Sequence, residues 1–221
     1  MIIFICSGKN DENTDSETLI LRCLEVYASK KGDPAALANV KIARNSYGKP
    51  FFENFYAEFS LSHTRGMKIV AAAESAVGAD VEFIRELPNA DGIAARFFTV
   101  GERRGIKTKE DFFRLWAAKE AYSKYTSLGI ASFKTFDISG LPASRRVYSE
   151  YGYPRTDSFN TLEASGLPTA GSERAPFGTA SFRTFNIGAI NGTRLIGLDV
   201  GAGYAAAVAG GGGENIEFYM L

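Results

Sequence analysis

Two carboxylates lie two residues apart at Asp80 and Glu82, and a third, Glu120, lies in a later segment beside two lysines. Side chains alternate along a strand, so Asp80 and Glu82 point to one face if residues 76–83 form a strand. Carboxylates this close repel each other unless one binds a proton or a cation lies between them. Three hard oxygen ligands beside lysines are typical of a site where Mg²⁺ or Mn²⁺ holds a diphosphate. The simplest alternative is a solvated strand face.

The segment 108–125 predicts a helix that brings the third carboxylate to such a site. Its apolar residues recur at helical spacing, and its first residues, from Thr108 to Asp111, resemble a capping box. Glu120 and Lys124 are i,i+4 neighbours, and as a surface ion pair they would contribute only a few tenths of a kcal/mol. Trp116 lies one turn before Glu120, however, and an unpaired carboxylate beside apolar surface is costly. A bound cation would relieve that cost.

Other residues could bind an anion. His63 is the single histidine, which excludes multi-histidine zinc sites and makes a histidine-based triad a weak hypothesis. With Ser62 it ends a predicted strand, where a hydroxyl, a ring N–H and backbone N–H groups can bind an anion. Lys49 lies between a glycine and a proline in a predicted turn. The alternatives are a structural histidine and an ordinary exposed turn lysine.

The composition excludes several classes of protein. The 221 residues include 25 Lys+Arg and 25 Asp+Glu, so we expect no nucleic-acid partner. Cys6 and Cys23 form no metal-ligand or CxxC pattern, and the chain has no G-x-x-x-x-G-K-[ST] phosphate loop. No stretch approaches the roughly 18 apolar residues of a membrane span, and the N-terminal residues do not resemble a signal peptide. We therefore expect a cytoplasmic protein with no membrane partner.

Periodicity and chain breakers predict the elements that must position these residues. Helices are predicted over 16–31, 93–98 and 108–125, the last with Gly129 as its C′ glycine. Strands are predicted over 1–6, 58–62, 67–74, 76–83, 131–138, 181–190, 195–200, 203–209 and 216–220. Residues 140–178 are rich in Gly, Pro, Ser and Thr, and predict long connections around one or two short strands.

A faint internal repeat suggests two halves. Residues 66–83 read GMKIVAAAESAVGADVEF and residues 203–218 read GYAAAVAGGGGENIEF, which align with one two-residue gap. Runs of small residues can also align by chance. A true repeat would divide the chain into similar halves at 1–95 and 96–221. It would place Asn215 opposite Asp80, so that one metal site and not two would follow.

Four motifs in this order resemble the signature of the 4′-phosphopantetheinyl transferases. They are Gly48–Pro50, Ser60–Thr64, Val77–Glu82 and Trp116–Tyr122. The length and the apparent halves resemble the larger, surfactin-synthetase-activating type, which implies a monomer. The implied fold is α+β, with two pseudo-symmetric halves, mainly antiparallel sheets and an active site between the halves.

The resemblance also implies a reaction. A serine hydroxyl of an apo acyl- or peptidyl-carrier protein would attack the β-phosphate of coenzyme A and release adenosine 3′,5′-bisphosphate. Mg²⁺, replaceable by Mn²⁺, would be held by Asp80, Glu82 and Glu120. Glu120, or a water on the metal, would take the serine proton, and Lys119 and Lys124 would face the diphosphate. The implied catalytic residues are Asp80, Glu120 and Lys124, and the implied coenzyme A-binding residues are Arg44, Lys49, Pro50, Ser62, His63, Lys119 and Lys124.

Some parts of the chain depart from the family pattern. The basic N-terminal segment with which larger members hold the nucleotide has no clear match, although Lys41 and Arg44 could replace it. Glu102 matches a further acidic position beside the site. Basic residues between the two metal-ligand segments could attract an acidic carrier protein, or could be a solvated turn. They are Arg96, Arg103, Arg104, Lys107 and Lys109.

Two other functions remain open from the sequence. One is a non-catalytic protein of the same fold that binds coenzyme A or a nucleotide. The other is an unrelated Mg²⁺-dependent phosphohydrolase, which would need a positioned water and no protein acceptor.

Overall fold

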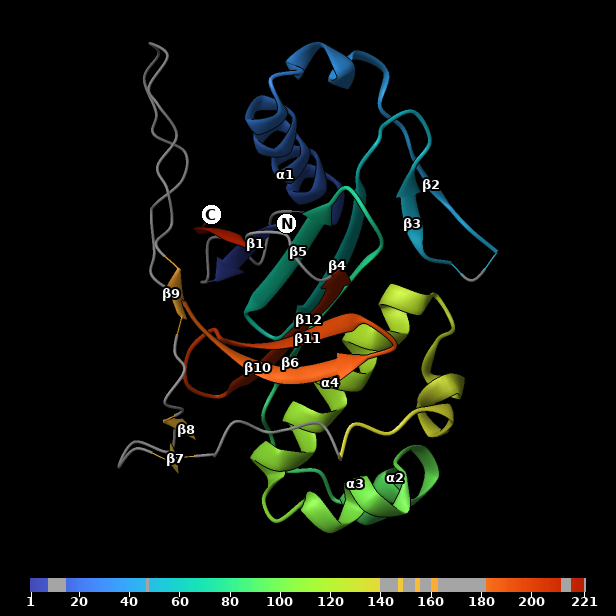
Figure 1. The fold of residues 1–221 in the computed structure, drawn as a ribbon, viewed down its shortest axis with the longest axis vertical. Coiled ribbons are helices and arrows are strands. Elements are labelled where there is room, and N and C mark those ends of the chain that lie inside the picture. The colour runs from blue at the N-terminus through green and yellow to red at the C-terminus, as the bar shows by residue number, and fades with distance from the viewer. Residues whose placement is uncertain are drawn as a thin grey trace.

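The computed structural model describes residues 1–7, 15–46, 48–139, 147–148, 154–155, 160–162, 182–211 and 216–220. Helix α1 (Ser16–Lys31) and helix α4 (Lys109–Thr126) are the two long helices of these residues, and each packs on its own sheet (Figure 1). None of the described helices is long and apolar enough to cross a membrane.

The first sheet has the strand order β13-β1-β5-β4. Its strands are β13 (Glu217–Met220), β1 (Ile2–Ser7), β5 (Met67–Ala73) and β4 (Glu58–Thr64). The pairs of β1 with β5 and of β4 with β5 are antiparallel, and the pair of β1 with β13 is parallel. Alternate residues of β1 therefore face opposite sides: Phe4 packs under α1, while Ile3 and Ile5 face the second sheet.

The second sheet has the order β6-β12-β11-β10-β9, and each of its pairs is antiparallel. Its strands are β6 (Val77–Phe83), β12 (Tyr204–Gly211), β11 (Thr193–Asp199), β10 (Phe182–Ile190) and β9 (Asn160–Leu162). Residues of both sheets share one apolar core, which includes Ile69, Val81 and Val208. The order of layers is α1, first sheet, second sheet, α4. The α+β fold with mainly antiparallel sheets is thus confirmed.

The edges of the two sheets meet along β4 and β6. Three hydroxyls on one face of β4 accept hydrogen bonds from alternate backbone N–H groups of β6. Ser60 Oγ accepts from Ala79 N at 2.9 Å and Ser62 Oγ from Val81 N at 3.3 Å. Thr64 Oγ1 accepts from Phe83 N at 3.1 Å. We call this row of bonds the hydroxyl seam. It satisfies edge N–H groups that would otherwise be buried without a partner.

The sheets do not divide the chain at residue 95. β6 precedes this boundary but belongs to the second sheet, and β13 follows it but belongs to the first. Both copies of the proposed repeat therefore hold a strand of one sheet followed by a strand of the other. The proposed counterpart of Asp80, Asn215, lies outside the described residues.

The elements around the site differ from the predictions in three places. The predicted strand over 131–138 is wrong, because Ile130–Thr135 forms a 3₁₀ helix, η2. Its hydroxyls bond back to carbonyls three residues earlier, Ser132 Oγ to Gly129 O and Thr135 Oγ1 to Ser132 O, both at 2.7 Å. These local bonds favour a tight turn over an extended strand. Gly129 is not the C′ glycine of α4, since Ser127 takes the left-handed conformation with φ of 59°.

The third difference is that the predicted single helix over 93–98 is a pair. It consists of α2 (Ala90–Phe97) and α3 (Val100–Gly105). Smaller elements are η1 (Pro34–Asn39), the hairpin of β2 (Ile42–Arg44) with β3 (Pro50–Phe52), and the pair β7 (Val147–Tyr148) with β8 (Pro154–Arg155). Apart from β7, β8 and β9, the predicted connections over 140–178 lie outside the described residues.

Candidate active site at the edge of the second sheet

Helix α4 lies unusually close to strand β6, and Gly78 makes this possible. A Cβ atom at Gly78 would lie 1.9 Å from the backbone oxygen of Ala121 and 2.5 Å from the backbone nitrogen of Tyr125. Only a residue without a side chain permits such an approach. The contact holds the last turns of α4, with Glu120 and Lys124, against the strand that carries Asp80.

The α4 helix is well defined at both ends. Thr108 and Asp111 form the predicted capping box, in which each side chain accepts a hydrogen bond from the other's backbone N–H. Phe112, Ala117 and Ala121 are buried in the core between α4 and the second sheet. The helix is thereby fixed in rotation, so that each polar residue on it has one defined direction.

Asp80 is the centre of the site and is only 3% exposed. Its Oδ1 accepts a hydrogen bond from Ser62 Oγ at 2.8 Å and an ion-paired hydrogen bond from Lys124 Nζ at 2.7 Å. Lys124 Nζ also donates to Ala79 O at 3.2 Å. The other oxygen, Asp80 Oδ2, is buried and has no hydrogen-bond partner among the described residues. A buried carboxylate oxygen without a donor is costly and is a natural position for a cation.

Glu82 and Glu120 add two more carboxylates near Asp80. Burial, and then the charges of Asp80 and Glu82, raise the pKa of Glu120 to about 7, against the opposing effect of Lys124. Burial and the charge of Asp80 also raise the pKa of Glu82, although Arg85 lies 3.6 Å from it. The charge of Asp80 therefore disfavours the ionised form of both glutamates, as expected where negative charge is gathered for a positive ligand.

The donor set fits a hard divalent cation in its chemistry, because it offers carboxylate oxygens, one of them an unpartnered buried atom. In the described part of the chain, however, no three His, Cys, Asp or Glu side chains are grouped closely enough to hold an ion as they stand. The residues that would hold Mg²⁺ are Asp80, Glu82 and Glu120, and this assignment stays a prediction.

Lys49 reaches this site from the β2–β3 hairpin. Its Nζ donates to the backbone oxygen of Lys124 at 3.0 Å, and burial lowers the pKa of its ammonium group. Arg44 is exposed in the same hairpin, with Nη1 donating to Gly48 O at 2.9 Å, and Pro50 begins β3. The hairpin therefore lies beside the C-terminal end of α4. That Arg44, Lys49 and Pro50 bind coenzyme A stays a prediction.

Ser62 and His63 separate onto opposite faces of β4. The Ser62 hydroxyl is buried and already bonded to Asp80 and Val81, whereas the sequence predicted that it would bind coenzyme A. Strand alternation turns this hydroxyl into the seam, and whether Ser62 binds coenzyme A stays a prediction. His63 is exposed, and its predicted contact with coenzyme A is untested.

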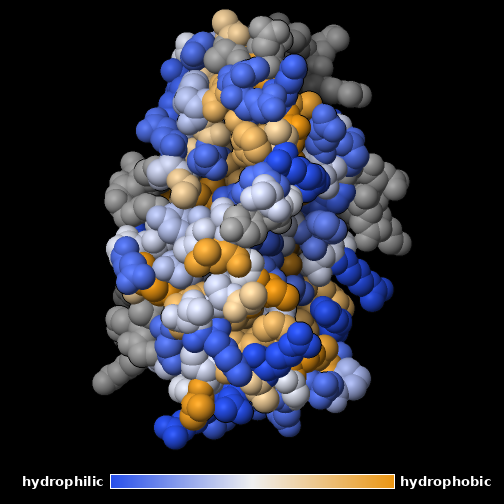
Figure 2. All heavy atoms as spheres, turned by 90° about the vertical axis from the view of Figure 1, so that its right-hand side faces the viewer, coloured by the Kyte–Doolittle hydropathy of each residue, from blue (hydrophilic) through white to orange (hydrophobic). Residues whose placement is uncertain are grey.

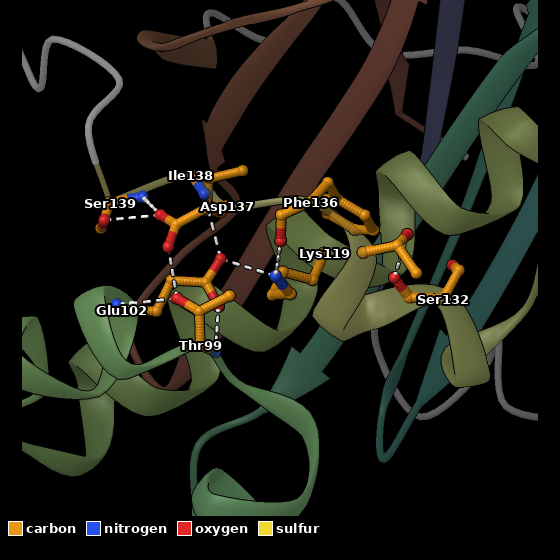
Figure 3. Close-up of polar contacts among 9 residues, drawn as sticks. Thr99, Glu102, Lys119, Ser132, Phe136, Asp137, Ile138 and Ser139 are labelled. Carbon is orange, nitrogen blue, oxygen red and sulfur yellow. Dashed lines mark hydrogen bonds and ion pairs between the residues drawn. The ribbon is translucent and has the colours of Figure 1, made fainter.

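Lys119 does not face the site, which contradicts the prediction for this residue. Its side chain has 0% exposure and its Nζ is bonded to Glu102 Oε1 at 2.5 Å and to Phe136 O at 2.9 Å (Figure 3). Its ammonium also lies 4.1 Å from the centre of the Phe136 ring. Successive helix residues point about 100° apart, so the neighbour of Glu120 is turned into the core on the other side.

Glu102, predicted to lie beside the site, is the buried partner in this network. Its Oε1 accepts from Ile138 N at 3.0 Å and its Oε2 from Thr99 N at 2.9 Å, the latter as part of a capping box that begins α3. The Glu102–Lys119 pair thus ties α3 and the segment after η2 to the middle of α4 (Figure 3). Burial lowers the pKa of Lys119, opposed by its bond to Glu102.

Three residues that shape the site, Gly78, Ser60 and Thr64, have no role predicted from the sequence. Gly78 lay inside a recognised motif, but only the packing of α4 explains why a glycine is needed there. Ser60 and Thr64 belong to the hydroxyl seam. The alternation of hydroxyl residues at 60, 62 and 64 was the available signal, because it places three hydroxyls on one strand face.

The predicted basic residues lie on α2, α3, the start of α4 and the connection between α3 and α4, and each is exposed. Lys109 is paired with Glu86 at 2.6 Å, and Arg96 lies over the ring of Phe97. Val100 is also exposed, at 57%. On the face shown in Figure 2, hydrophobic groups lie among hydrophilic ones. Whether the basic residues bind a carrier protein is untested.

Comparisons with known proteins agree with the motifs. The family model described as "4'-phosphopantetheinyl transferase superfamily" matches residues 76–170, which include Asp80, Glu82, Glu120 and Lys124. The 4′-phosphopantetheinyl transferase HetI of Nostoc sp. is 33% identical over 114 residues, covering 47% of this chain and 48% of that protein. The 4′-phosphopantetheinyl transferase gsp of Aneurinibacillus migulanus is 34% identical over 98 residues, covering 42% of this chain and 40% of that protein.

A third relative, the 4′-phosphopantetheinyl transferase psf-1 of Bacillus pumilus, is 34% identical over 91 residues, or 38% of each chain. The matches span about half the length of these relatives or less. The matched segment nevertheless contains the three carboxylates and the lysine that β6 and α4 hold together. In this segment, the chain is thus similar to the 4′-phosphopantetheinyl transferase superfamily.

Proposed function

We propose that this protein transfers the 4′-phosphopantetheine group of coenzyme A to a serine of an apo acyl- or peptidyl-carrier protein, in a reaction that needs Mg²⁺. The observation that carries the proposal is the state of Asp80: one oxygen is bonded to Ser62 and Lys124, and the other is buried and unpartnered beside two further carboxylates. Its relatives are named as enzymes of this activity.

The residues have distinct tasks in the proposed reaction. The serine oxygen of the carrier forms a bond to the β-phosphorus, and the bond from that phosphorus to the bridging oxygen breaks. Adenosine 3′,5′-bisphosphate leaves with the bridging oxygen. Mg²⁺, when bound by Asp80, Glu82 and Glu120, would neutralise charge on the diphosphate.

Glu120 is suited to accept the serine proton, because a pKa of about 7 is close to the working pH of a general base. Lys124 lies at the same end of the site and would stabilise the charge that develops on the diphosphate as the bond breaks. The Lys49 ammonium, at the end of α4, would bind the phosphate at the adenosine end of coenzyme A.

The test is incubation with coenzyme A, Mg²⁺ and a panel of apo carrier proteins, followed by intact mass measurement. We expect one phosphopantetheine group on a carrier, no addition in EDTA, and restored addition with Mn²⁺. Asp80→Asn should lower the rate about 10²–10³-fold, because it removes a charge that acts on the transition state. Glu86→Gln, which neutralises an exposed carboxylate paired with Lys109, is the matched control and should be unaffected.

The other outcomes identify the alternative functions. Binding of coenzyme A without modification of any carrier would favour a non-catalytic binding protein of this fold. Cleavage of coenzyme A in the absence of a carrier would favour a phosphohydrolase. Equal rates for Asp80→Asn and wild type at limiting Mg²⁺ would contradict the metal assignment. A monomeric state and a cytoplasmic location stay predictions.

A further inference from the structure

In the hydroxyl seam, Ser62 both accepts a hydrogen bond from β6 and donates one to Asp80. Ser60, Ser62 and Thr64 each accept one backbone N–H from β6. Ser62 in addition donates its own proton to Asp80 Oδ1 at 2.8 Å. Both Ser62 and Asp80 are buried, at 7% and 3% exposure, so this bond lies away from bulk water. A hydroxyl that accepts from Val81 N has its proton free to point at the carboxylate.

The bond divides the two oxygens of Asp80 between different tasks. Oδ1 takes both donors, Ser62 Oγ at 2.8 Å and Lys124 Nζ at 2.7 Å, while Oδ2 takes none. One donor comes from strand β4 and the other from helix α4. Together they fix the rotation of the Asp80 carboxylate about its Cβ–Cγ bond. Oδ2 is therefore held in one orientation, without a partner among the described residues, and is left available to a cation.

We infer that Ser62 is a positioning residue, which holds the Asp80 carboxylate in the orientation that leaves Oδ2 free for the metal ion. The inference rests on the proposed function for the identity of the metal site. It gives Ser62 a task different from coenzyme A binding. Partners that orient a metal ligand typically change metal affinity or activity about 10- to 100-fold when removed.

The chain offers a matched control for this inference. Ser60 lies two residues earlier on the same face of β4, is buried to a similar extent at 4%, and accepts Ala79 N at 2.9 Å. Ser60→Ala therefore removes a seam bond without removing a bond to Asp80. Ser62→Thr keeps the hydroxyl, and Thr64 shows that a threonine fits the geometry of the seam.

The experiment measures Mn²⁺ binding to the purified full chain by electron paramagnetic resonance or calorimetry, without coenzyme A or a carrier. We expect Ser62→Ala to raise the Mn²⁺ dissociation constant about 10-fold or more. Ser60→Ala should remain within about twofold of wild type, and Ser62→Thr should restore most of the affinity. In transfer assays at limiting Mn²⁺, Ser62→Ala should lower the rate while KM for coenzyme A changes little. Thermal melts of each variant establish that it is folded, and if Ser62→Ala is not folded, Ser62→Cys, which has a weaker donor, replaces it.

Three results would overturn the inference. Equal Mn²⁺ affinity of Ser62→Ala and Ser60→Ala would show that the bond to Asp80 does not orient a ligand. A raised KM for coenzyme A with unchanged Mn²⁺ affinity would show that Ser62 binds the donor. Absence of Mn²⁺ binding by wild type would overturn both this inference and the metal assignment. Failure of wild type to modify any carrier, with Mn²⁺ binding altered as expected, would overturn the proposed function alone.

Discussion

The approach of α4 to β6 can be tested by adding one methyl group at Gly78. In Gly78→Ala the new Cβ would lie 1.9 Å from Ala121 O, whereas ordinary contact begins near 3.4 Å. Neither of its nearest neighbours can turn away, because both are backbone atoms of a helix. The helix must therefore withdraw from the strand by an amount on the order of 1 Å.

That withdrawal has two consequences of different size. Overpacking of a close contact typically costs about 1–3 kcal/mol, which for a chain of this length lowers the melting temperature by roughly 2–4 °C per kcal/mol. It also moves Lys124 Nζ, now 2.7 Å from Asp80 Oδ1, toward the limit of hydrogen-bond reach. A misplacement of about 1 Å in a catalytic site can cost about 10²-fold in rate. We therefore expect a variant that still folds but whose transfer rate is about 100-fold lower.

Gly210→Ala is the control, measured by the same thermal melts and intact-mass transfer assay. Gly210 lies on the neighbouring strand β12, opposite Val77, and its Cβ would meet only the Met1 Cε at 2.2 Å. That methyl is the far end of a flexible side chain and can rotate away, so the control should lose less than about 1 kcal/mol and keep its rate. If the two variants have the same melting temperature and rate, the close approach does not position the site, and the reasoning above is wrong.

Three further predictions concern the charged residues. Glu102→Gln leaves Lys119 buried without its counter-charge and should lower the free energy of unfolding, measured in urea, by about 3–5 kcal/mol. The double variant Glu102→Gln with Lys119→Met should lose less than the sum of the two single variants. Additive losses would contradict a coupled pair. Burial raises the pKa of Glu120 above that of the unfolded chain, so ionisation opposes folding, and the metal-free protein should lose stability as pH rises from about 4.5 past 7. Glu120→Gln should remove that loss and should be more stable than wild type by up to about 3 kcal/mol at pH 8.5 in EDTA, since one pKa unit corresponds to about 1.36 kcal/mol; parallel pH profiles would be inconsistent with a buried charge. Lys49→Ala should raise KM for coenzyme A more than it lowers kcat, with a smaller difference for dephospho-coenzyme A; equal effects on both donors would argue against a phosphate contact.

The sequence was sufficient for the parts of the fold that local signals determine. The capping box at Thr108 and the apolar spacing that follows it predict α4, and the alternation at Asp80 and Glu82 predicts a strand with both carboxylates on one face. The direction of Lys119 was not predictable in this way. It depends on which side of α4 is occupied by Glu102 and Phe136, and these come from distant segments.

Ser62 and η2 illustrate two other limits of predicting structure from sequence patterns. A strand pattern indicates which residues share a face, but not which strand lies opposite, so the bond from Ser62 to Asp80 required the meeting of two sheet edges. In residues 131–134 the apolar and polar residues alternate as in a strand, yet hydroxyl bonds to carbonyls three residues earlier favour a 3₁₀ turn. The secondary structure of such short segments depends on local hydrogen bonds, which the spacing of apolar residues does not indicate.

Because of the hydroxyl seam, hydrogen exchange along strand β6 should distinguish separation of the two sheets from loss of β6 from its own sheet. The amides of Ala79, Val81 and Phe83 are bonded to side chains of β4, while the alternate amides, of which Ile84 N is bonded to Gly203 O at 2.7 Å, face β12. If the two sheets part without unfolding, only the first set should exchange its hydrogens with solvent. If β6 leaves its own sheet, both sets should exchange together. Amide exchange along a single strand can thus distinguish separation of the two sheets from unfolding of the second sheet.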